Sequence, residues 1–387
     1  MAIVKMIDIC EKIGSGATPR GGKEAYCDEG VSLVRSQNVL DFAFSRDGLA
    51  HINGVQAQKL NNVEVREGDV LLNITGDSVA RACMMDADFL PARVNQHVAI
   101  VRGKENKVIN SFILYFLQWR KGYLLQLASA GATRNALTKG MIEQLEINLP
   151  SMNEQKKIVA VLDSIQQKIQ LNRKINDNLQ QQASVLYGKF FPYAIADELP
   201  AGWRVGTVGE IIEIHDSKRI PLSGAQRAKV EKRIYPYYGA ASLMDYVDEY
   251  IFDGKYLLLG EDGTVVDDAG YPILQYVWGK FWVNNHAHIL TGKLGFNVES
   301  LLLLFKRTPV KSIVTGAVQP KISQANLRSI QVVVPPQPEL DAFNELIRPL
   351  FDQIRQNQDQ NKALTSLRDA LLPKLLSGEI DVSDIQL

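Results

Sequence analysis

Two groups of residues have the types and spacing that could bind a metal ion. Glu261-Asp262 and Asp267-Asp268 bring four carboxylates close together in the chain, and His286 and His288 would place two imidazole rings on one face of an alternating strand. The acids, however, surround several glycines, a composition typical of turns. No third ligand accompanies the histidines. We therefore expect turns and hydrogen-bonded imidazoles here, and predict no metal site.

A glycine-rich segment and an aromatic segment are the remaining candidates for chemistry. Gly14-Ser15-Gly16-Ala17-Thr18-Pro19 lacks the lysine and the strand-to-helix context of a phosphate-binding loop, so it predicts a turn. Phe190-Phe191-Pro192-Tyr193 lacks the leading asparagine with which the Asn-Pro-Pro-Tyr motif of amino-methyltransferases holds its target amine. The sequence thus predicts no catalytic residues and no cofactor of the chain's own.

An internal duplication is the strongest pattern in the chain. Residues 131–186 recur without a gap at 316–371, an offset of 185 residues, and Val94-Asn95-Gln96-His97 returns as Val283-Asn284-Asn285-His286. This period far exceeds the roughly 20 to 50 residues of solenoid repeats, so each copy should be a whole domain. β-branched and aromatic runs bounded by turn residues predict strands in both copies.

We predict an α+β fold with a pseudo-two-fold internal repeat. Two strand-rich heads, at residues 1–150 and 196–336, should be separated by two long helices, at 151–195 and within 337–387. Ser151-Met152-Asn153-Glu154 has the form of a capping box after Pro150, and the first helix should be roughly 50 to 55 Å long at a rise of 1.5 Å per residue. Pro349 could kink the second helix.

Matching heptad rows predict that the two helices form an antiparallel coiled coil. Each row is apolar except for one asparagine, Asn172 in the first copy and Asn357 in the second, and Asn176 and Asn361 also match. A buried asparagine lowers stability but penalises slipped registers. The alternative is that each helix packs only on its own head, with these asparagines in solvent.

Composition and charge describe an ordinary soluble chain with local basic segments. The three cysteines (Cys10, Cys27, Cys83) form no CxxC pair, and no apolar run approaches the ~18 residues of a membrane span, so we expect a cytoplasmic protein without a signal peptide. Its 43 basic and 43 acidic residues balance. Residues 93–139 and 280–338 are nevertheless rich in Lys and Arg, which suits phosphate contacts in both heads.

Several motifs resemble those of one known family, in the same order along the chain. Three of them lie in the first head: Ser15-Gly16-Ala17-Thr18-Pro19, Gly30-Val31-Ser32-Leu33-Val34-Arg35 and Gly68-Asp69-Val70-Leu71-Leu72. Two lie in the second head: Tyr235-Pro236-Tyr237-Tyr238-Gly239 and Leu259-Gly260-Glu261-Asp262-Gly263. All five are similar to motifs of the DNA-specificity (S) subunits of type I restriction-modification enzymes. Pro150 through Glu154-Gln155 resembles that family's entrance to its helices. The second copy has Leu340 in place of this Gln.

The resemblance implies two target-recognition domains that each read one half of a split, asymmetric site in double-stranded DNA. The helices would set the spacing and dock two methyltransferase (M) subunits, and restriction (R) subunits can join. S-adenosylmethionine, ATP and Mg²⁺ would belong to those partners, and this chain would catalyse nothing. A two-headed protein scaffold that does not bind DNA is the alternative. A single-chain restriction enzyme would need additional nuclease and methyltransferase regions.

Side chains that can contact phosphates or base edges are the candidate DNA-binding residues. In the first head they are Arg20, Lys23, Arg35, Gln37, Asn38, Arg81, Arg93, Arg134 and Asn135. In the second head they are Lys218, Arg219, Arg227, Tyr237, Tyr238, Asn285 and Lys321.

Overall fold

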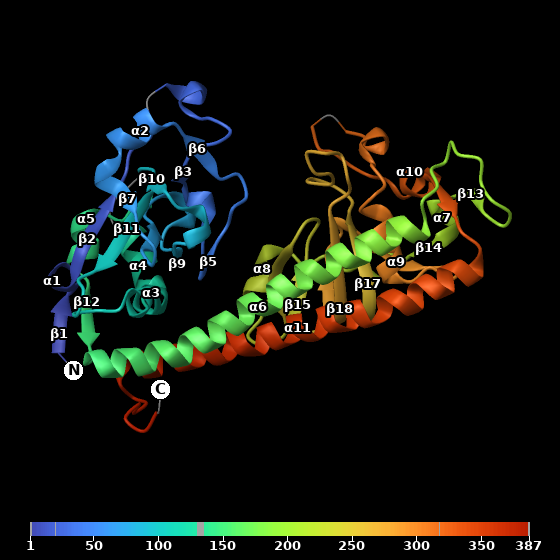
Figure 1. Cartoon of the computed structure of the whole chain (residues 1–387). Coiled ribbons are helices and arrows are strands. Elements are labelled where there is room, and N and C mark those ends of the chain that lie inside the picture. Colours follow the sequence, from blue (N-terminus) through green and yellow to red (C-terminus); the bar gives the residue numbers. More distant parts are fainter. Residues whose placement is uncertain (1, 20, 130–134, 317, 386–387) are drawn as a thin grey trace. The chain divides into compact units, whose positions relative to one another are not determined.

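The computed structural model of the chain forms two compact units, which are described separately. It describes residues 2–19, 21–129, 135–316 and 318–385, apart from the side chains of residues 22 and 23. The first unit comprises residues 1–172 and 359–387, and the second comprises residues 173–358. Figure 1 labels most of the helices and strands. Among the described residues, no helix has the length and apolar character needed to cross a membrane.

The first unit contains two four-stranded sheets. One has the antiparallel order β2 (Cys10–Ser15), β11 (Val98–Gly103), β8 (Val70–Asn73), β9 (Ala82–Met84). The other has the order β6 (Ala50–Ile52), β3 (Val31–Val34), β10 (Ala92–Val94), β7 (Glu64–Val65), with β3 and β10 parallel. Its further elements are β1 (Ala2–Lys5), β4 (Val39–Leu40), β5 (Ala43–Phe44), β12 (Glu146–Leu149), α1 (Met6–Ile9), α2 (Gly54–Lys59), α3 (Asn110–Trp119), α4 (Lys121–Ser129) and α5 (Lys139–Glu143).

The second unit is built on one six-stranded sheet. Its order is β14 (Ile212–Ile214), β19 (Ala287–Gly292), β17 (Phe252–Gly260), β18 (Leu274–Val283), β15 (Tyr235–Tyr238), β16 (Leu243–Val247). β13 (Arg204–Thr207) pairs with β20 (Gln331–Val334), and the short helices are α7 (Val208–Ile211), α8 (Gly224–Ala228), α9 (Val298–Phe305) and α10 (Gln324–Ser329).

The two units differ in their sheets but share several strand pairings, as the sequence duplication predicts. β1 pairs antiparallel with β12 in the first unit, and β13 pairs antiparallel with β20 in the second. β20 lies 185 residues after β12, the offset of the sequence repeat. The parallel pairing of β3 with β10 likewise returns as the parallel pairing of β15 with β18. The α+β fold with an internal repeat is therefore confirmed.

The two long helices are α6 (Met152–Phe190) and α11 (Gln337–Ser377). The capping box forms: the Ser151 N–H donates to Glu154 Oε2 at 2.8 Å, and the Glu154 N–H donates to Ser151 Oγ at 3.4 Å. α6 continues through Gly188, and α11 is helical on both sides of Pro349. Apolar side chains of α6 such as Ile158 and Leu162 enter the core of the first unit.

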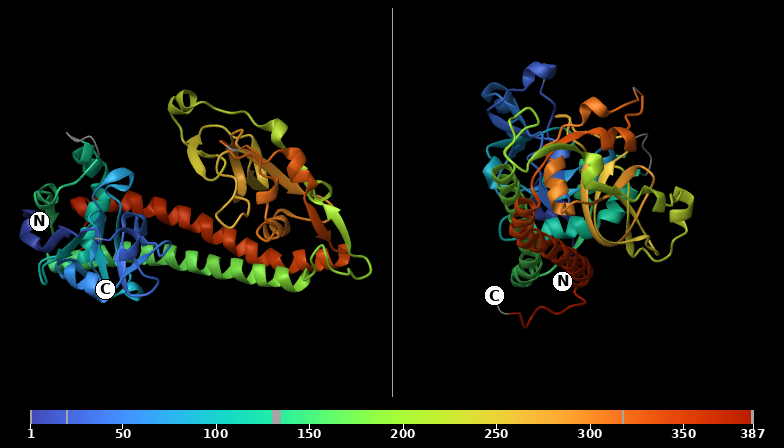
Figure 2. Two further views of the ribbon diagram at one scale, coloured as in Figure 1. Left: turned by 90° about the horizontal axis from the view of Figure 1, so that it is seen from above. Right: turned by 90° about the vertical axis from the view of Figure 1, so that its right-hand side faces the viewer.

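Within each unit, a segment of α6 pairs with a segment of α11. In the first unit the Asn172 amide donates to Asn361 Oδ1 at 2.9 Å and to Gln360 Oε1 at 2.8 Å. In the second, where Figure 2 shows the two segments side by side, the Asn357 amide donates to Asn176 Oδ1 at 2.8 Å and the Asn176 amide donates to the Ile354 carbonyl at 3.2 Å. Asn172, Asn176 and Asn357 are buried, so they are not the solvated residues of the alternative interpretation.

The Asn176–Asn357 pair can be tested by thermal denaturation. The single variant Asn357→Leu should lower the free energy of unfolding by about 1 to 3 kcal/mol, because it leaves the buried side-chain oxygen Oδ1 of Asn176 without its donor. The double variant Asn176→Leu/Asn357→Leu should recover most of that loss, because both polar partners are removed together. Asn178→Leu, at an exposed position of α6, is the matched control. Additive losses from the two single changes would show that the pair is not coupled.

Candidate nucleic-acid interface

β8, which contains the last three residues of the motif Gly68–Leu72, and its counterpart β17 in the second unit end in the same hydrogen-bonded frame. After β8, the Ile74 N–H donates to the His97 carbonyl at 3.0 Å, and the Ile74 carbonyl accepts from the Leu137 N–H at 2.8 Å. After β17, the Glu261 N–H donates to the His286 carbonyl at 2.8 Å, and the Glu261 carbonyl accepts from the Ile322 N–H at 2.8 Å. Ile74 and Glu261 therefore occupy equivalent positions.

A glycine two residues later completes each frame. The N–H of Gly76 donates to the Asn135 carbonyl at 3.0 Å, and the N–H of Gly263 donates to the Pro320 carbonyl at 3.0 Å. Their φ angles are +74° and +83°, in the left-handed region that glycine adopts without strain. Each turn is thus joined by main-chain bonds to a segment about 60 residues further along the chain.

A histidine lies over each turn. Asn95 Oδ1 accepts from the His97 N–H at 2.9 Å, and Asn284 Oδ1 accepts from the His286 N–H at 2.8 Å. The Nδ1 atom of His97 is 2.6 Å from Thr75 Oγ1, while Nδ1 of His286 is bonded to Asp262 Oδ1. The duplicated Val-Asn-x-His sequence therefore builds one local structure twice. From the sequence we took Asn285 as a candidate DNA-binding residue and weighed His286 as a metal ligand, but we missed both histidines as residues of this site.

The segment after β3 or β15 is the last part of each frame. The N–H of Asn95 donates to the Val34 carbonyl, and that of Asn284 donates to the Tyr238 carbonyl, both at 3.0 Å. Residues 35–38 and residues 239–242 hence occupy corresponding places. We call the whole arrangement the turn cluster. It comprises residues 35–38, 74–78, 95–97 and 135–137 in the first unit, and residues 239–242, 261–263, 284–286 and 320–322 in the second.

The first turn cluster surrounds an open depression of about 470 Å³, lined by Ser36, Gln37, Thr75, Gly76, Asp77, Ser78, Arg81 and His97. Three predicted DNA-binding residues come together here: Gln37 and Arg81 line the depression, and Asn135 is exposed beside Gly76. Arg35 is adjacent and half-buried, with its guanidinium bonded to the Gly48 carbonyl. The Gln37 amide nitrogen donates to the Gly48 carbonyl at 3.1 Å, which leaves its second hydrogen and its oxygen for other partners. The depression is thus lined by an exposed amide and a guanidinium, the groups that read purine edges.

The remaining first-head predictions fall into two groups. Asn38 is buried and bonds the Arg35 N–H and the Ser45 carbonyl, and Arg93 is buried with bonds to the Ala57 carbonyl and Asn61. For Asn38 and Arg93 the prediction of a DNA contact needs correction, because their polar atoms are hydrogen-bonded inside the first unit. Arg20 and Arg134 lie outside the described residues, as does the side chain of Lys23.

In the second head, the exposed candidates are Asn285 and Lys321, both in the turn cluster, and Lys218, which lies beside Asp216. Tyr238 is half-buried with its ring edge-on to Phe281, 5.9 Å between centroids.

The other three second-head candidates have internal roles, and their prediction also needs correction. Arg219 bonds Glu261 and the Ala287 carbonyl. Arg227 bonds the Leu222 carbonyl and lies 4.9 Å from the ring centroid of Tyr237. Tyr237 is only 1% exposed, and its hydroxyl accepts from the Leu222 N–H at 3.1 Å. These contacts join the loop after β14 to the sheet.

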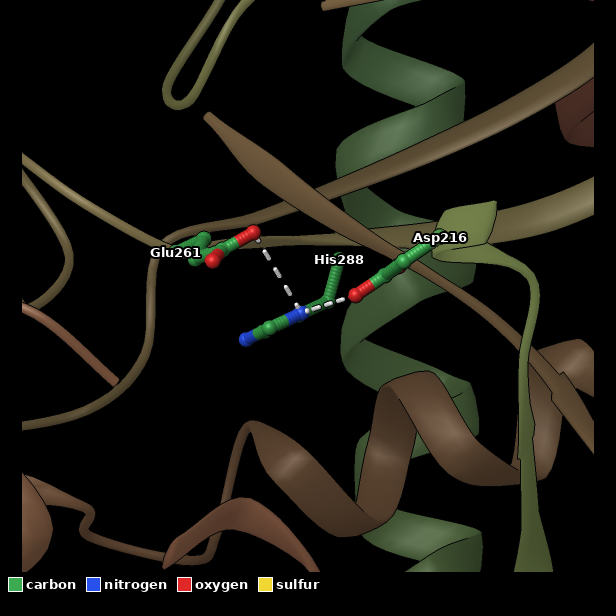
Figure 3. Close-up of side chains that lie close together, drawn as sticks. All are labelled: Asp216, Glu261 and His288. Atoms are coloured by element: carbon green, nitrogen blue, oxygen red, sulfur yellow. Dashed lines mark hydrogen bonds and ion pairs between the residues drawn. The ribbon is translucent and has the colours of Figure 1, made fainter. Parts of the chain in front are cut away.

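Beneath the second turn cluster, His288 lies between two carboxylates (Figure 3). Its Nδ1 atom is 2.6 Å from Asp216 Oδ2 and 3.7 Å from Glu261 Oε2, and its Nε2 donates to the Ile322 carbonyl at 2.8 Å. Arg219 Nη1 lies 2.6 Å from Glu261 Oε2, and Lys321 Nζ lies 3.2 Å from Glu261 Oε1. The equivalent positions in the first head, Ile74 and Ala99, are apolar.

The three possible ligand atoms of Asp216, Glu261 and His288 lie within 4.8 Å of one another, but cations already face both carboxylates. We therefore interpret the group as an ion-pair network that fixes the frame. The expected shared strand face for His286 and His288 is wrong, because β19 begins at Ala287 and His286 belongs to the preceding turn. Gly263 and Gly270, which lie next to the acidic residues Asp262 and Asp268, have φ angles of +83° and +90°. These left-handed φ angles are those that glycine adopts in turns, as the sequence predicted for this segment.

The charge of Asp216 should stabilise the second unit. Burial raises the pKa of Asp216, but the hydrogen bonds from His288 and the Ile289 N–H and the charge of Arg219 outweigh it, so this pKa is below its ordinary value. A lowered folded-state pKa gives stability that is present above the unfolded pKa of about 3.9 and is lost as the pH falls through the lower folded value.

Asp216→Asn should therefore lower the free energy of unfolding at pH 7 by about 3 kcal/mol, because a buried ion pair loses one partner. The wild type should lose its advantage over the variant as the pH falls below about 4, which thermal melts at several pH values would show. Asp268→Asn removes the same charge from an exposed turn and is the control. A pH-independent difference between Asp216→Asn and wild type would rule out the electrostatic explanation.

The comparisons with known proteins agree with this duplicated architecture. The model of the type I restriction modification DNA specificity domain matches residues 1–181 and again residues 200–366. The MjaIX specificity subunit of Methanocaldococcus jannaschii is 25% identical over 329 residues, and the match covers 76% of this chain and 74% of the relative. The MjaX specificity subunit of the same organism is 20% identical, and the match covers 97% of this chain and 92% of the relative. The crystal structure of the type I restriction-modification S subunit from M. genitalium matches with a TM-score of 0.56 at 16% identity, and the match covers 97% of this chain and 96% of that one. The two chains therefore share a fold. Because the domain model accounts for most of the chain in two successive copies, the chain belongs to the family of type I restriction-modification DNA specificity subunits.

Proposed function

We propose that each head reads one half of a bipartite DNA site through its turn cluster. The observation that carries this proposal is that both heads build the same main-chain frame but line it with different side chains. A shared frame presents both clusters in one way, while different side chains contact different base edges. The resulting target is asymmetric, and the heads correspond to residues 1–150 and 196–336.

The exposed side chains divide into those that contact bases and those that contact phosphates. Gln37, Arg81 and Asn135 in the first head and Asn285 in the second can form bidentate hydrogen bonds with purine edges. Lys218 and Lys321 are exposed cations suited to phosphate oxygens. Lys321 is already paired with Glu261, so its ammonium is held at a fixed place beside the turn.

The chain is the recognition component of a larger enzyme and is not itself catalytic. Its paired helices α6 and α11 set the spacing between half-sites and dock two methyltransferase subunits, and restriction subunits join that complex in the cytoplasm. S-adenosylmethionine, ATP and Mg²⁺ belong to these partners. A specificity-family model matched in both halves supports this function over that of a protein scaffold unrelated to DNA.

Exchanging one head tests whether the heads act independently. Replacing residues 196–330 with the corresponding head of a related subunit should change one half of the methylated sequence and leave the other half unchanged, because each frame is closed within its own unit. Mapping of methylated adenines in cells that express the chimera with its methyltransferase subunits would measure both halves. If the exchange altered both halves together, the heads would read DNA jointly and the modular proposal would fail.

Matched alanine variants test the proposed contacts within each head. Gln37→Ala should weaken binding of the specific duplex by about 1 to 3 kcal/mol and relax discrimination only in the first half-site, whereas Asn285→Ala should do the same only in the second. Competition binding with duplexes altered in one half-site at a time separates the two effects. Lys59→Ala, on the exposed surface of α2, is the control and should leave discrimination unchanged. Equal loss in both half-sites would argue against direct base contacts.

A further inference from the structure

The segments after β3 and β15 hold equivalent places but have opposite chemistry. In the first head this segment is Arg35-Ser36-Gln37-Asn38, which is polar. The side-chain nitrogens of Arg35, Gln37 and Asn38 donate to main-chain carbonyls of residues 45–48, and the Gln37 side chain is exposed. In the second head it is Gly239-Ala240-Ala241-Ser242, followed by Leu243 and Met244. Since the Val34 and Tyr238 carbonyls accept the same bond from Asn95 and Asn284, the difference lies in the side chains and not in the frame.

The second segment is the tip of a two-stranded ribbon at the edge of the six-stranded sheet. β15 and β16 pair antiparallel, and β15 pairs with β18 through Tyr237 and Tyr238 alone. β16 is the outermost strand, and its first two residues are exposed, Leu243 by 42% and Met244 by 53%. Exposed apolar residues on an edge strand are unfavourable in water unless something covers them.

Contacts at the tip fix Met244 beside the turn cluster. Its Sδ atom lies 3.4 Å from the Asn284 amide nitrogen, and a Cβ atom added at Gly239 would lie 2.4 Å from that sulfur. Met244 therefore lies across Gly239, next to the turn that presents Asn285. The Gln275 amide donates to the Gly239 carbonyl at 2.9 Å and supports the tip from β18. The apolar tip is thus continuous with the proposed DNA-reading surface.

Charge on the ribbon is compatible with DNA. The only acid of β16, Asp245, is 2.6 Å from Arg233 and 3.4 Å from Arg227, so two cations surround one anion. Lys280 lies 4.6 Å from the ring centroid of Tyr250 near the start of β17. Asp248 and Glu249 follow β16 at the end of the ribbon away from Leu243 and Met244. The apolar tip therefore suits the major groove, which admits a two-stranded β-ribbon.

We propose that the β15–β16 ribbon contacts the methyl group of a thymine in the second half-site, with Met244 as the specificity-determining residue, whereas the first head reads its half-site by hydrogen bonds. The C5-methyl of thymine is the apolar group that a base pair presents in the major groove. Met244 is flexible and polarisable, and a methyl group fits against it. This inference rests on the proposed function and identifies the base chemistry of one head.

Replacing thymine by deoxyuridine tests the inference, since it removes only the methyl group. Half-sites are first defined by mapping methylated adenines, and the full chain with its methyltransferase subunits is then titrated with duplexes that carry deoxyuridine at one thymine at a time. One substitution in the second half-site should weaken binding about fourfold, the effect of one buried methyl group, and substitutions in the first half-site should have no effect.

The variant Met244→Ala should reduce the thymine-to-deoxyuridine ratio to about one while its melting temperature stays at that of the wild type. Val55→Ala, at an exposed apolar position of the first head, should keep the fourfold ratio. The inference is overturned if the second half-site contains no thymine, if deoxyuridine has no effect there, or if Met244→Ala keeps the wild-type ratio. Failure to distinguish the specific duplex from a scrambled one would instead overturn the proposed function itself.

Discussion

The hydrogen bonds made by the main-chain N–H and carbonyl of Ile74 and of Glu261 are the constraint on which the rest of each head depends. Through these bonds a strand end, a histidine turn and a segment far along the chain meet at one point. Buried main-chain groups without partners would be strongly unfavourable, so the three segments can only be ordered together. The exposed side chains of each turn cluster owe their positions to these main-chain bonds.

Patterns with a local physical cause could be predicted from the sequence. The duplication indicated two similar heads, Ser151 and Glu154 indicated the start of α6, and the matching asparagines indicated a polar position in the helix pair. In the structure, Asn172 pairs with Asn361 and Asn176 pairs with Asn357, so each bonds a residue other than its own repeat counterpart. That partner choice follows from the antiparallel direction of the helices.

Long-range pairing explains most of what could not be predicted. Nothing near Arg93 or Arg219 in the sequence reveals that their guanidinium groups bond carbonyls of distant segments. The same holds for Asn38, whose amide closes a loop, and for His288, whose two partners come from other elements. Residue type shows which side chains can donate a hydrogen bond. Whether a donor is available to a ligand depends on whether the fold already pairs it with an internal acceptor.

The frame of each turn cluster consists of main-chain donors and acceptors, so its closure does not depend on which side chains it exposes. One position carries isoleucine in the first head and glutamate in the second, yet both make the same two main-chain bonds. Mutations that change the exposed side chains therefore need not disturb the closure of the frame. Under the proposed function, substitutions at these exposed positions would change the target sequence without removing the main-chain bonds that close the frame, so the scaffold is suited to evolving new specificities.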